Sequence, residues 1–406
     1  MATRQLDGLT PGQRVAWHRI RRGKSQGVLA GLVGRTEDWL SKIENDRAPL
    51  DRISVIKALA GALDVSVFDL IGESRPETTG RHRHVEEVRA ALMDYRQLSP
   101  LLSAIEAEGE PPNLDRLRVD LADVMRAYQE SRYGQVLRLL PELLTQSQIA
   151  VHEWSGNDRH HVERTAALAD QSAAIILTKL GESELAWIAA QRGLATAERS
   201  EDPAVIGSLL RSVIHALHTD GRAGDATDMT RRAADYLRRE LDLSAAQIVS
   251  IYGALLLPGA VAAARANDRS TAGAYLDEAE EMAAHLGADA NHLWTAFGPT
   301  NVNIHRVTIA MALGDVQVAL DLIPKINTTG LPAERCVRHV LEVANVYHAS
   351  NKVDQAIQQL LVAERQAPEQ VHGHVMSRQL VLRMRTTATG KRSRILADLA
   401  RRMKIL

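Results

Sequence analysis

The side chains that could support catalysis or metal binding are few and scattered. The densest cluster is His160-His161-x-Glu163. Neighbouring residues on a helix point about 100° apart, so these two imidazoles do not share a metal ion as an i, i+4 pair would. The single cysteine, Cys336, is expected to be a small core residue rather than a redox centre. Phosphate-binding glycine loops, nucleophile elbows and paired carboxylates are not found. We therefore expect no enzyme, no cofactor and no metal ion.

A basic segment near the N-terminus offers a different chemistry, the binding of phosphate groups. Its cations, which have no acid among them, are Arg14, Arg19, Arg21, Arg22 and Lys24. By itself, such a run of cations is as easily explained by a solvent-exposed helix face as by phosphate binding. A DNA-reading pattern follows it directly, and this favours phosphate contacts. The chain as a whole has 49 basic and 50 acidic residues, so any nucleic-acid surface must be local.

The residues after this segment predict two short helices joined by a tight turn. Ser25 and Thr36 are good N-caps, and Gly34 can turn the chain sharply between them. We expect the following apolar residues to face inward, together with two from the preceding helix: Leu29, Leu32, Val33, Leu40, Ile43, Val15 and Ile20. The outer face of the second helix then carries Glu37, Asp38, Ser41 and Lys42. This is the pattern of a helix-turn-helix that reads DNA.

Two further helices, over residues 51–63 and 67–71, complete a five-helix unit. The stretches RIRRGKSQ, LAGLVGRTEDWLSKIEN and LAGALDVSVFDLI, within Arg14–Ile71, resemble the XRE-type (lambda-repressor-like) helix-turn-helix domain of bacterial transcription factors. This resemblance implies a buried ion pair between Arg19 and Glu44. It also implies that the Gln26 amide touches a phosphate and that Asn45 anchors the following loop to the backbone. The residues that should approach the major groove are Arg35, Thr36, Glu37, Asp38, Ser41 and Lys42. The candidate DNA-binding residues are these eight, together with Arg47 and with Arg14, Arg22 and Lys24 of the basic segment.

The segment departs from the family pattern at several positions. Asp46 stands where the family often has glycine, and Glu37 and Asp38 place two acids at the groove. Acids can accept a hydrogen bond from a cytosine amine, but they repel phosphates, so no base preference follows. Trp39 is expected to pack rather than to contact a base.

The remaining chain divides into a linker and a long helical region. We expect a DNA-binding domain over residues 1–73, a linker over 74–84 and a helical repeat domain over 85–406. The repeat domain is marked by turns of small residues, each followed by a buried small residue on the next helix. The turns lie at Ser131–Gly134, Leu180–Glu182, Asp220–Gly221, Asn267–Asp268, Leu313–Asp315 and Ser350–Lys352. The small residues are Val136, Ala186, Ala226, Ala272, Ala319 and Ala356. This series resembles degenerate tetratricopeptide repeats over roughly residues 115–370.

Two further stretches are the segment WTAFGPTNV at Trp294–Val302 and the ending LADLARRMKIL. With them, the full length resembles the actinobacterial class of XRE-type regulators with tetratricopeptide-like C-terminal domains and, more distantly, peptide-sensing regulators of Gram-positive bacteria. Since the first helix of each repeat lines the concave side of such a stack, polar residues there are candidates for ligand binding. The polar candidates are Arg118, Tyr128, Arg211, His215, His218, Asn301, Arg338, Asn345 and His348. Ile304 falls on the same side, and the rare aromatics Trp294 and Phe297 could form pocket walls. The alternative is that the polar residues line a solvent-filled groove without binding a ligand and that the two aromatic residues pack in the core.

Together these patterns predict an all-α protein: a five-helix lambda-repressor-like DNA-binding domain followed by an α-solenoid of tetratricopeptide-like hairpins. We expect a cytoplasmic homodimer, joined through the repeat domain, that binds a double-stranded operator with an inverted repeat. A peptide or small molecule in the solenoid would act as effector, and no membrane is involved. The alternative is a protein-interaction scaffold in which DNA binding is secondary or lost.

Overall fold

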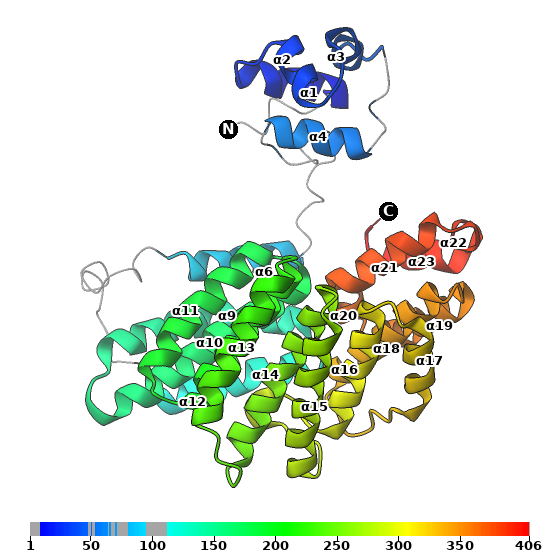
Figure 1. Cartoon of the computed structure of the whole chain (residues 1–406). Coiled ribbons are helices and arrows are strands. Elements are labelled where there is room, and N and C mark those ends of the chain that lie inside the picture. The colour runs from blue at the N-terminus through cyan, green and yellow to red at the C-terminus, as the bar shows by residue number, and fades with distance from the viewer. Residues whose placement is uncertain are drawn as a thin grey trace. The chain divides into compact units, whose positions relative to one another are not determined.

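The computed structural model describes residues 9–47, 50, 53–63, 65, 70, 80–94 and 112–405. This part of the chain is α-helical and contains no strand, only an isolated β-bridge between Ala290 and Phe297. The chain divides into two compact units, Met1–Arg83 and His84–Leu406, whose helices are labelled in Figure 1. The prediction of an all-α fold is confirmed.

The N-terminal unit is built from α1 (Pro11–Arg21), α2 (Gln26–Leu32), α3 (Glu37–Glu44) and α4 (Ile53–Leu63). The side-chain oxygens of Thr10, Ser25 and Thr36 accept backbone N–H groups at the starts of the first three helices. The helix predicted over 67–71 lies outside the described residues except for Leu70. The shared core consists of Val15, Leu29, Ala30, Leu40, Ile56, Leu59, Ala60, Leu63 and Leu70.

Two apolar residues that the sequence placed inside this unit are exposed. Ile20 is 66% exposed and Leu32 is 60% exposed. Ile20 follows Val15 by five residues, which turns it about 140° around the helix from the buried face. In α2 burial centres on Leu29 and Ala30, and Leu32 lies beyond that face. The inward assignment of both residues was wrong.

The boundary between the units falls within a helix. α6 (Gly80–Leu92) starts inside the predicted 74–84 linker, so the last residues of that linker are helical. The linker residues before Gly80 lie outside the described part of the chain.

The second unit begins with six helical hairpins in the described residues. They are α8 (Leu114–Gln129) with α9 (Tyr133–Glu153), α10 (Arg159–Leu180) with α11 (Ser183–Arg199), α12 (Pro203–Thr219) with α13 (Ala223–Arg239), α14 (Ala246–Arg265) with α15 (Arg269–Leu286), α16 (Pro299–Ala312) with α17 (Val316–Leu322), and α18 (Ala333–Ala349) with α19 (Val353–Gln366). α20 (Pro368–Gly373), α21 (Val375–Thr386), α22 (Ala388–Arg392) and α23 (Arg394–Arg402) follow. Short 3-10 helices lie at Gly156–Asp158, His292–Trp294 and Ile323–Lys325.

Each hairpin turns through one residue with left-handed backbone geometry. These residues are Ser131, Gly181, Gly221, Asn267, Gly314 and Asn351, with φ between 59° and 82°. The residue after each donates its N–H to a carbonyl five positions earlier, for example Glu182 to Leu177 at 2.9 Å and Asp315 to Ala310 at 2.8 Å. This is the bond of a Schellman motif, which favours glycine or asparagine at the left-handed position. The small-residue turns in the sequence mark these helix ends.

The small residue after each turn is buried against the partner helix. Val136, Ala186, Ala226, Ala272, Ala319 and Ala356 are all no more than 1% exposed. A small side chain at this place lets the two helices of a hairpin approach closely. The tetratricopeptide-like character predicted for this region therefore holds for all six hairpins in the described residues.

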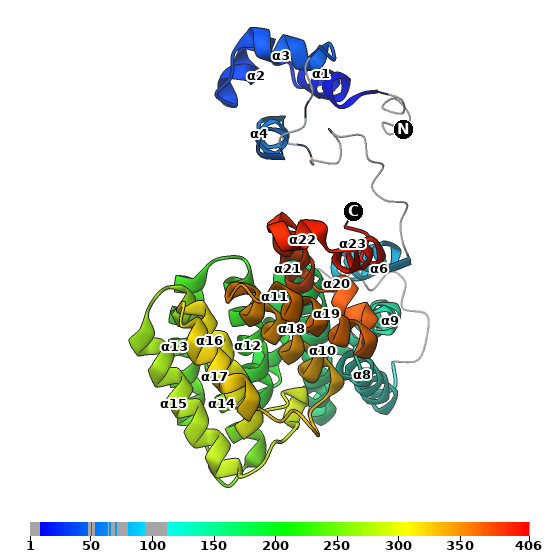
Figure 2. The same cartoon turned by 90° about the vertical axis from the view of Figure 1, so that its right-hand side faces the viewer.

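The solenoid closes on itself within the second unit. Figure 2 shows α20 beside α9, and hydrogen bonds join the two regions: Ser131 Oγ donates to Gln370 Oε1 at 2.7 Å, and the Gly134 N–H donates to Glu369 Oε2 at 2.6 Å. The side-chain amides of Gln129 and Asn291 also donate to each other, at 2.9 and 3.1 Å. Elements far apart in sequence therefore surround one central space.

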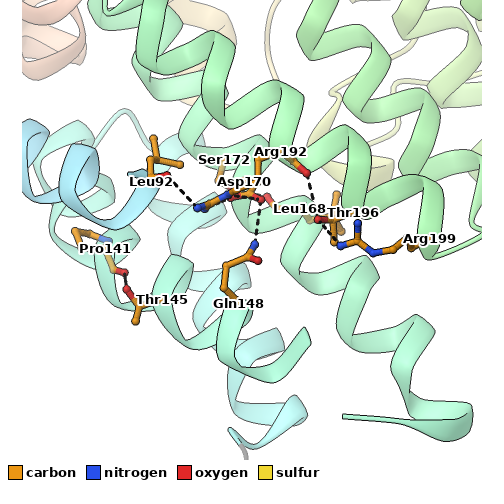
Figure 3. A network of polar contacts seen from close by, with 10 residues as sticks. All are labelled: Leu92, Pro141, Thr145, Gln148, Leu168, Asp170, Ser172, Arg192, Thr196 and Arg199. Atoms are coloured by element: carbon orange, nitrogen blue, oxygen red, sulfur yellow. Dashed lines mark hydrogen bonds and ion pairs between the residues drawn. The ribbon is translucent and has the colours of Figure 1, made fainter. Parts of the chain in front are cut away.

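A buried polar network fixes the early hairpins (Figure 3). Asp170, on α10, is fully buried, and both of its oxygens accept the Arg192 Nε–H, at 2.9 and 3.0 Å. Gln148 donates to the same carboxylate at 3.4 Å, and Arg192 donates to the Leu92 carbonyl at 3.4 Å. This arginine thereby ties the end of α6 to the hairpin of α10 and α11.

α14 alone among the described helices is long and apolar enough to cross a membrane, but 89% of its apolar window is buried inside the fold. Its apolar surface is core surface: neighbouring helices cover it.

Candidate functional site

The predicted DNA-reading helix is α3, and its polar residues lie on an exposed surface. Arg35, Thr36, Glu37, Asp38, Lys42, Asn45 and Arg47 are exposed, as is Arg22, while Arg14, Lys24, Gln26 and Ser41 are partly buried. Leu40 and Ile43 hold the opposite side of α3 in the core. The core of the unit therefore packs against one side of α3 and leaves the proposed DNA-reading side exposed.

A buried ion pair supports this helix from behind. Arg19 donates to Glu44 through Nε and Nη2, at 2.6 and 2.9 Å, and also donates to the Lys24 carbonyl at 2.8 Å. The two side chains are 13% and 3% exposed. The hydrogen bond to Glu44 raises the pKa of Arg19. The structure therefore contains the ion pair that the resemblance implied, and it joins α1 to the end of α3.

Gln26 completes this arrangement in a way that the sequence did not suggest. Its amide Nε2 donates to Glu44 Oε2 at 2.6 Å, so one carboxylate receives both Arg19 and Gln26. Gln26 was expected to touch a phosphate. In the structure its amide nitrogen is instead engaged with Glu44 at the start of α2.

Asp46, the departure from the family pattern, has a structural explanation. Its φ is 56°, in the left-handed region that glycine adopts with least strain. Its carboxylate accepts hydrogen bonds from Thr10 Oγ1 at 2.6 Å and from Gln13 Nε2 at 3.1 Å. Asp46 therefore holds the loop after α3 against the start of α1, and Asn45 caps α3 by donating to the Ser41 carbonyl at 2.8 Å.

The charged side chains of α3 have local partners. Lys42 Nζ lies 2.6 Å from Asp38 Oδ2, with both side chains more than half exposed. Exposed i, i+4 pairs contribute roughly 0.3–0.5 kcal/mol, so this pair is easily exchanged for a phosphate or a base. The Arg35 guanidinium lies 5.8 Å from the centre of the Trp39 ring. Trp39 itself packs partly buried against the core, as predicted.

The second unit contains a cavity of about 390 Å³. Residues from the first helix of every hairpin line it, joined by the segment around Trp294 and by the start of α21. Such a volume lies at the lower end of the range for small-molecule sites. The closed solenoid thus presents its concave side as a pocket.

Six of the predicted ligand-binding residues line this cavity: Tyr128, Arg211, His215, His218, Trp294 and Arg338, and Ile304 lines it with them. The other five candidates, among them the partly buried His348, are not in the lining. Arg118 is exposed and pairs with Asp115 at 3.1 Å, and Asn345 accepts a hydrogen bond from Arg383 at 3.1 Å. Phe297 and Asn301 are buried, 0% and 2% exposed.

The position of Phe297 is set by packing on α14. A Cβ added at Gly253 would lie 2.0 Å from the Phe297 ring, so the ring occupies the space that this glycine leaves. Phe297 therefore belongs to the core beneath the cavity wall, which was the alternative reading for the rare aromatics.

The cavity is rich in positive charge. Its charged lining residues are Lys179, Arg211, Arg265, Arg335 and Arg338, against Glu334 and Glu342. Lys179 pairs with Glu334 at 2.9 Å, and Arg338 pairs with Glu342 at 2.9 Å. Arg265 Nη1 lies 3.1 Å from His218 Nδ1 and donates to no carboxylate in the described residues. The carboxylates are thus matched to Lys179 and Arg338, and three arginine charges remain.

Burial shifts the pKa values of these groups strongly. Burial lowers the pKa of Lys179 to about 8, although Glu334 opposes the shift, and it lowers the pKa of Arg211 to about 10, aided by the neighbouring Arg335. Burial would raise the pKa of Glu334, but Lys179 and nearby arginines outweigh it and bring that pKa to about 2.

The histidines of the cavity are neutral at physiological pH. Burial, reinforced by nearby cations, lowers the pKa values of His218 and His305 to about 3 and those of His215 and His374 well below the ordinary value. The cavity's positive charge therefore comes from arginine and lysine.

Several cavity residues escaped the sequence reading: Lys179, Arg265, His305, Glu334, Arg335 and His374. A signal was present for Arg335, since it lies one helical turn before Arg338 on α18. His374 follows the last predicted repeat, and only closure of the solenoid brings it to the cavity.

The other candidate reactive residues lie elsewhere. His160 and His161 are exposed, while Glu163 is buried and pairs with Arg159 and Arg199. Cys336 is partly buried, with its thiol near the carbonyls of Thr328 and Leu331. Within the part of the chain that the structure describes, no cluster of three or more His, Cys, Asp or Glu could hold a metal ion.

Comparison with known proteins identifies the N-terminal unit. Residues 12–69 match the family model of the helix-turn-helix domain, so this unit is an XRE-like helix-turn-helix domain. A domain of this family supports a DNA-binding transcriptional regulator.

Among solved structures, Bacillus thuringiensis PlcR, crystallised in complex with the peptide PapR7 and DNA, is similar. It is 13% identical in sequence, with 68% of this chain and 95% of PlcR covered and a TM-score of 0.35. No curated protein sequence matches the chain.

Proposed function

We propose that this protein is a cytoplasmic, ligand-responsive regulator, in which an effector bound in the solenoid cavity changes the affinity of the helix-turn-helix domain for its operator. The observation that carries this proposal is the cavity of about 390 Å³, lined by the first helices of all six hairpins and by arginines that form no ion pair with a carboxylate in the described residues. A solenoid that only supported the DNA-binding domain would have no need of such charges in its interior.

The proposed mechanism is a population shift. Elements that lie far apart in sequence meet around the cavity, through Lys179 with Glu334 and through Gln129 with Asn291. A ligand that contacts both sides of the ring stabilises one arrangement of these contacts over another. Coupling to DNA then requires only that the two arrangements differ in operator affinity, and by linkage DNA would change ligand affinity by the same factor.

The DNA-binding form is proposed to be a homodimer joined through the repeat domain. One helix-turn-helix domain reads only a few base pairs, so a two-fold dimer on an inverted repeat is the natural route to operator affinity. The reading residues are proposed to be Ser41 and Lys42 on α3 and Arg35 just before it, with Arg22 and Lys24 on phosphates.

Genome-wide mapping of DNA bound to the full chain tests this function. We expect a small set of discrete sites that share an inverted repeat. Diffuse binding without a shared sequence, together with stable co-purification of another protein, would favour the scaffold alternative.

A further inference from the structure

Two arginines in the cavity form no ion pair within the described residues, although Glu334 lies near enough to attract both of their charges. The Nε atoms of Arg211 and Arg335 are buried and have no hydrogen-bond partner, and neither guanidinium forms an ion pair within the described residues. They stand on different helices, α12 and α18, and both line the cavity. Each is a rigid fork of N–H donors that matches the geometry of an oxyanion.

This arrangement is costly for the empty protein. Two like charges interact unfavourably in a medium of low dielectric, and buried donors without acceptors lose the hydrogen bonds they had with water. Arg335 lies close enough to contribute to the lowered pKa of Arg211. An anion placed between the two guanidinium groups would remove both costs at once.

The rest of the cavity wall suits an apolar or aromatic body. Ile175, Val261, Trp294 and Ile304 lie in the lining beside the charged groups. The segment that carries Trp294 is strained: Leu293, Trp294 and Ala296 have φ values of 44°, 57° and 48°. Non-glycine residues in this region are uncommon, and they gather at ligand clamps and switch segments.

We propose that the effector is a compact organic oxyanion, with a carboxylate or phosphate held between Arg211 and Arg335 and an apolar or aromatic body against Trp294, Val261 and Ile304. This rests on the proposed function and specifies its ligand. Neutral molecules would leave the two arginines without a counter-charge, and the cavity is too small for an extended polymer.

The test uses two fluorescent probes that differ by one charge. 8-Anilinonaphthalene-1-sulfonate carries an oxyanion on an aromatic body, and N-phenyl-1-naphthylamine is its uncharged counterpart. Both are titrated into the full chain, without DNA, as wild type, as Arg211→Gln/Arg335→Gln and as the charge-retaining Arg211→Lys/Arg335→Lys. The surface variant Arg231→Gln/Arg232→Gln, on exposed positions of α13, removes the same charge outside the cavity.

We expect the glutamine pair to weaken binding of the sulfonate probe about tenfold to hundredfold, since charge-assisted hydrogen bonds are lost. The lysine pair should restore part of that affinity, while the surface variant and the uncharged probe should change less than about twofold, within the ordinary range for exposed charges. Equal losses for both probes, an equal effect of the surface variant, or no binding of the sulfonate probe by the wild type would overturn the proposal.

Displacement of the bound probe then separates the two kinds of oxyanion. Benzoate and phenyl phosphate share one ring, and benzyl alcohol is their uncharged control. Displacement by either anion but not by the alcohol supports the proposal and names the headgroup, whereas displacement by the alcohol alone contradicts it. Because no DNA is present, failure here refutes the ligand class while discrete sites in genome-wide mapping would still support a regulator.

Discussion

Acidification should destabilise the solenoid, because its cavity keeps four histidines neutral. The folded pKa values of His218 and His305 are about 3, and those of His215 and His374 also lie well below 6.5. Each histidine in the unfolded chain titrates near pH 6.5, so below that pH the unfolded state binds more protons than the folded state. The free energy of unfolding must then fall as pH decreases through 6.5.

The size of this effect follows from the pKa values. Between about pH 7.5 and pH 5.5, His218 and His305 each cost between about 1 and 2 kcal/mol, or about 3 kcal/mol together, and His215 and His374 act in the same direction. This is a large fraction of the stability of a typical domain. Glu334, with a folded pKa of about 2, begins to contribute only below about pH 4.5, so the histidines dominate this window.

Urea unfolding of the full chain, followed by far-UV circular dichroism at both pH values, measures this loss. The variant His305→Gln should reduce the pH dependence by one histidine's share, while the exposed His160→Gln should leave it unchanged. A free energy of unfolding that is the same at both pH values, or an equal effect of the two variants, would refute the claim that burial keeps the cavity histidines neutral.

Two further predictions concern the cavity and the reading helix. Lys179 has a folded pKa of about 8, so an anion that binds beside it should raise that pKa and take up a fraction of a proton near pH 8. Calorimetry in two buffers with different ionisation enthalpies measures the uptake, and proton release on binding would contradict it. Arg19→Ala should unfold or strongly loosen the N-terminal unit, by about 3–5 kcal/mol, because it leaves Glu44 buried without its partner. The exposed Arg21→Ala serves as control, and Trp39 fluorescence reports the unfolding; similar effects of both variants would show that the ion pair is not important.

The repeated turns show how much of the fold the sequence could reveal. Left-handed residues such as Gly181 and Asn267 are drawn from a small set of residue types, and the residue that packs behind each turn must be small. Both constraints are local, so they are visible as a periodic pattern. The helix α3 and the N-caps Ser25 and Thr36 could be predicted from the sequence for the same reason, because their constraints are also local.

Closure of the solenoid was not readable, because it depends on the sum of many small rotations between hairpins. The pairing of Ser131 with Gln370 joins residues that no local pattern connects. The polar residues on the first helices could be named, but which of them reach the cavity depends on this closure. Arg338 lines the cavity and Asn345, two turns further along α18, does not.

The departures within the N-terminal unit have similar causes. Ile20 is exposed because its angle around α1, not its apolar character, decides where it points. Gln26 donates to Glu44 because a buried carboxylate can accept several hydrogen bonds, and a resemblance in sequence does not specify which side chains donate them.

Binding of a DNA segment recovered by genome-wide mapping to the wild type and to Arg35→Ala/Lys42→Ala, compared in a gel shift at one salt concentration, tests the central claim most directly. The two replaced side chains are exposed and have only weak local partners, so the variant should remain folded by circular dichroism. We predict that it loses about a hundredfold or more in affinity, since one base contact contributes about 1–3 kcal/mol and a dimer presents each contact twice. An unchanged affinity would contradict the assignment of α3 as the DNA-reading helix.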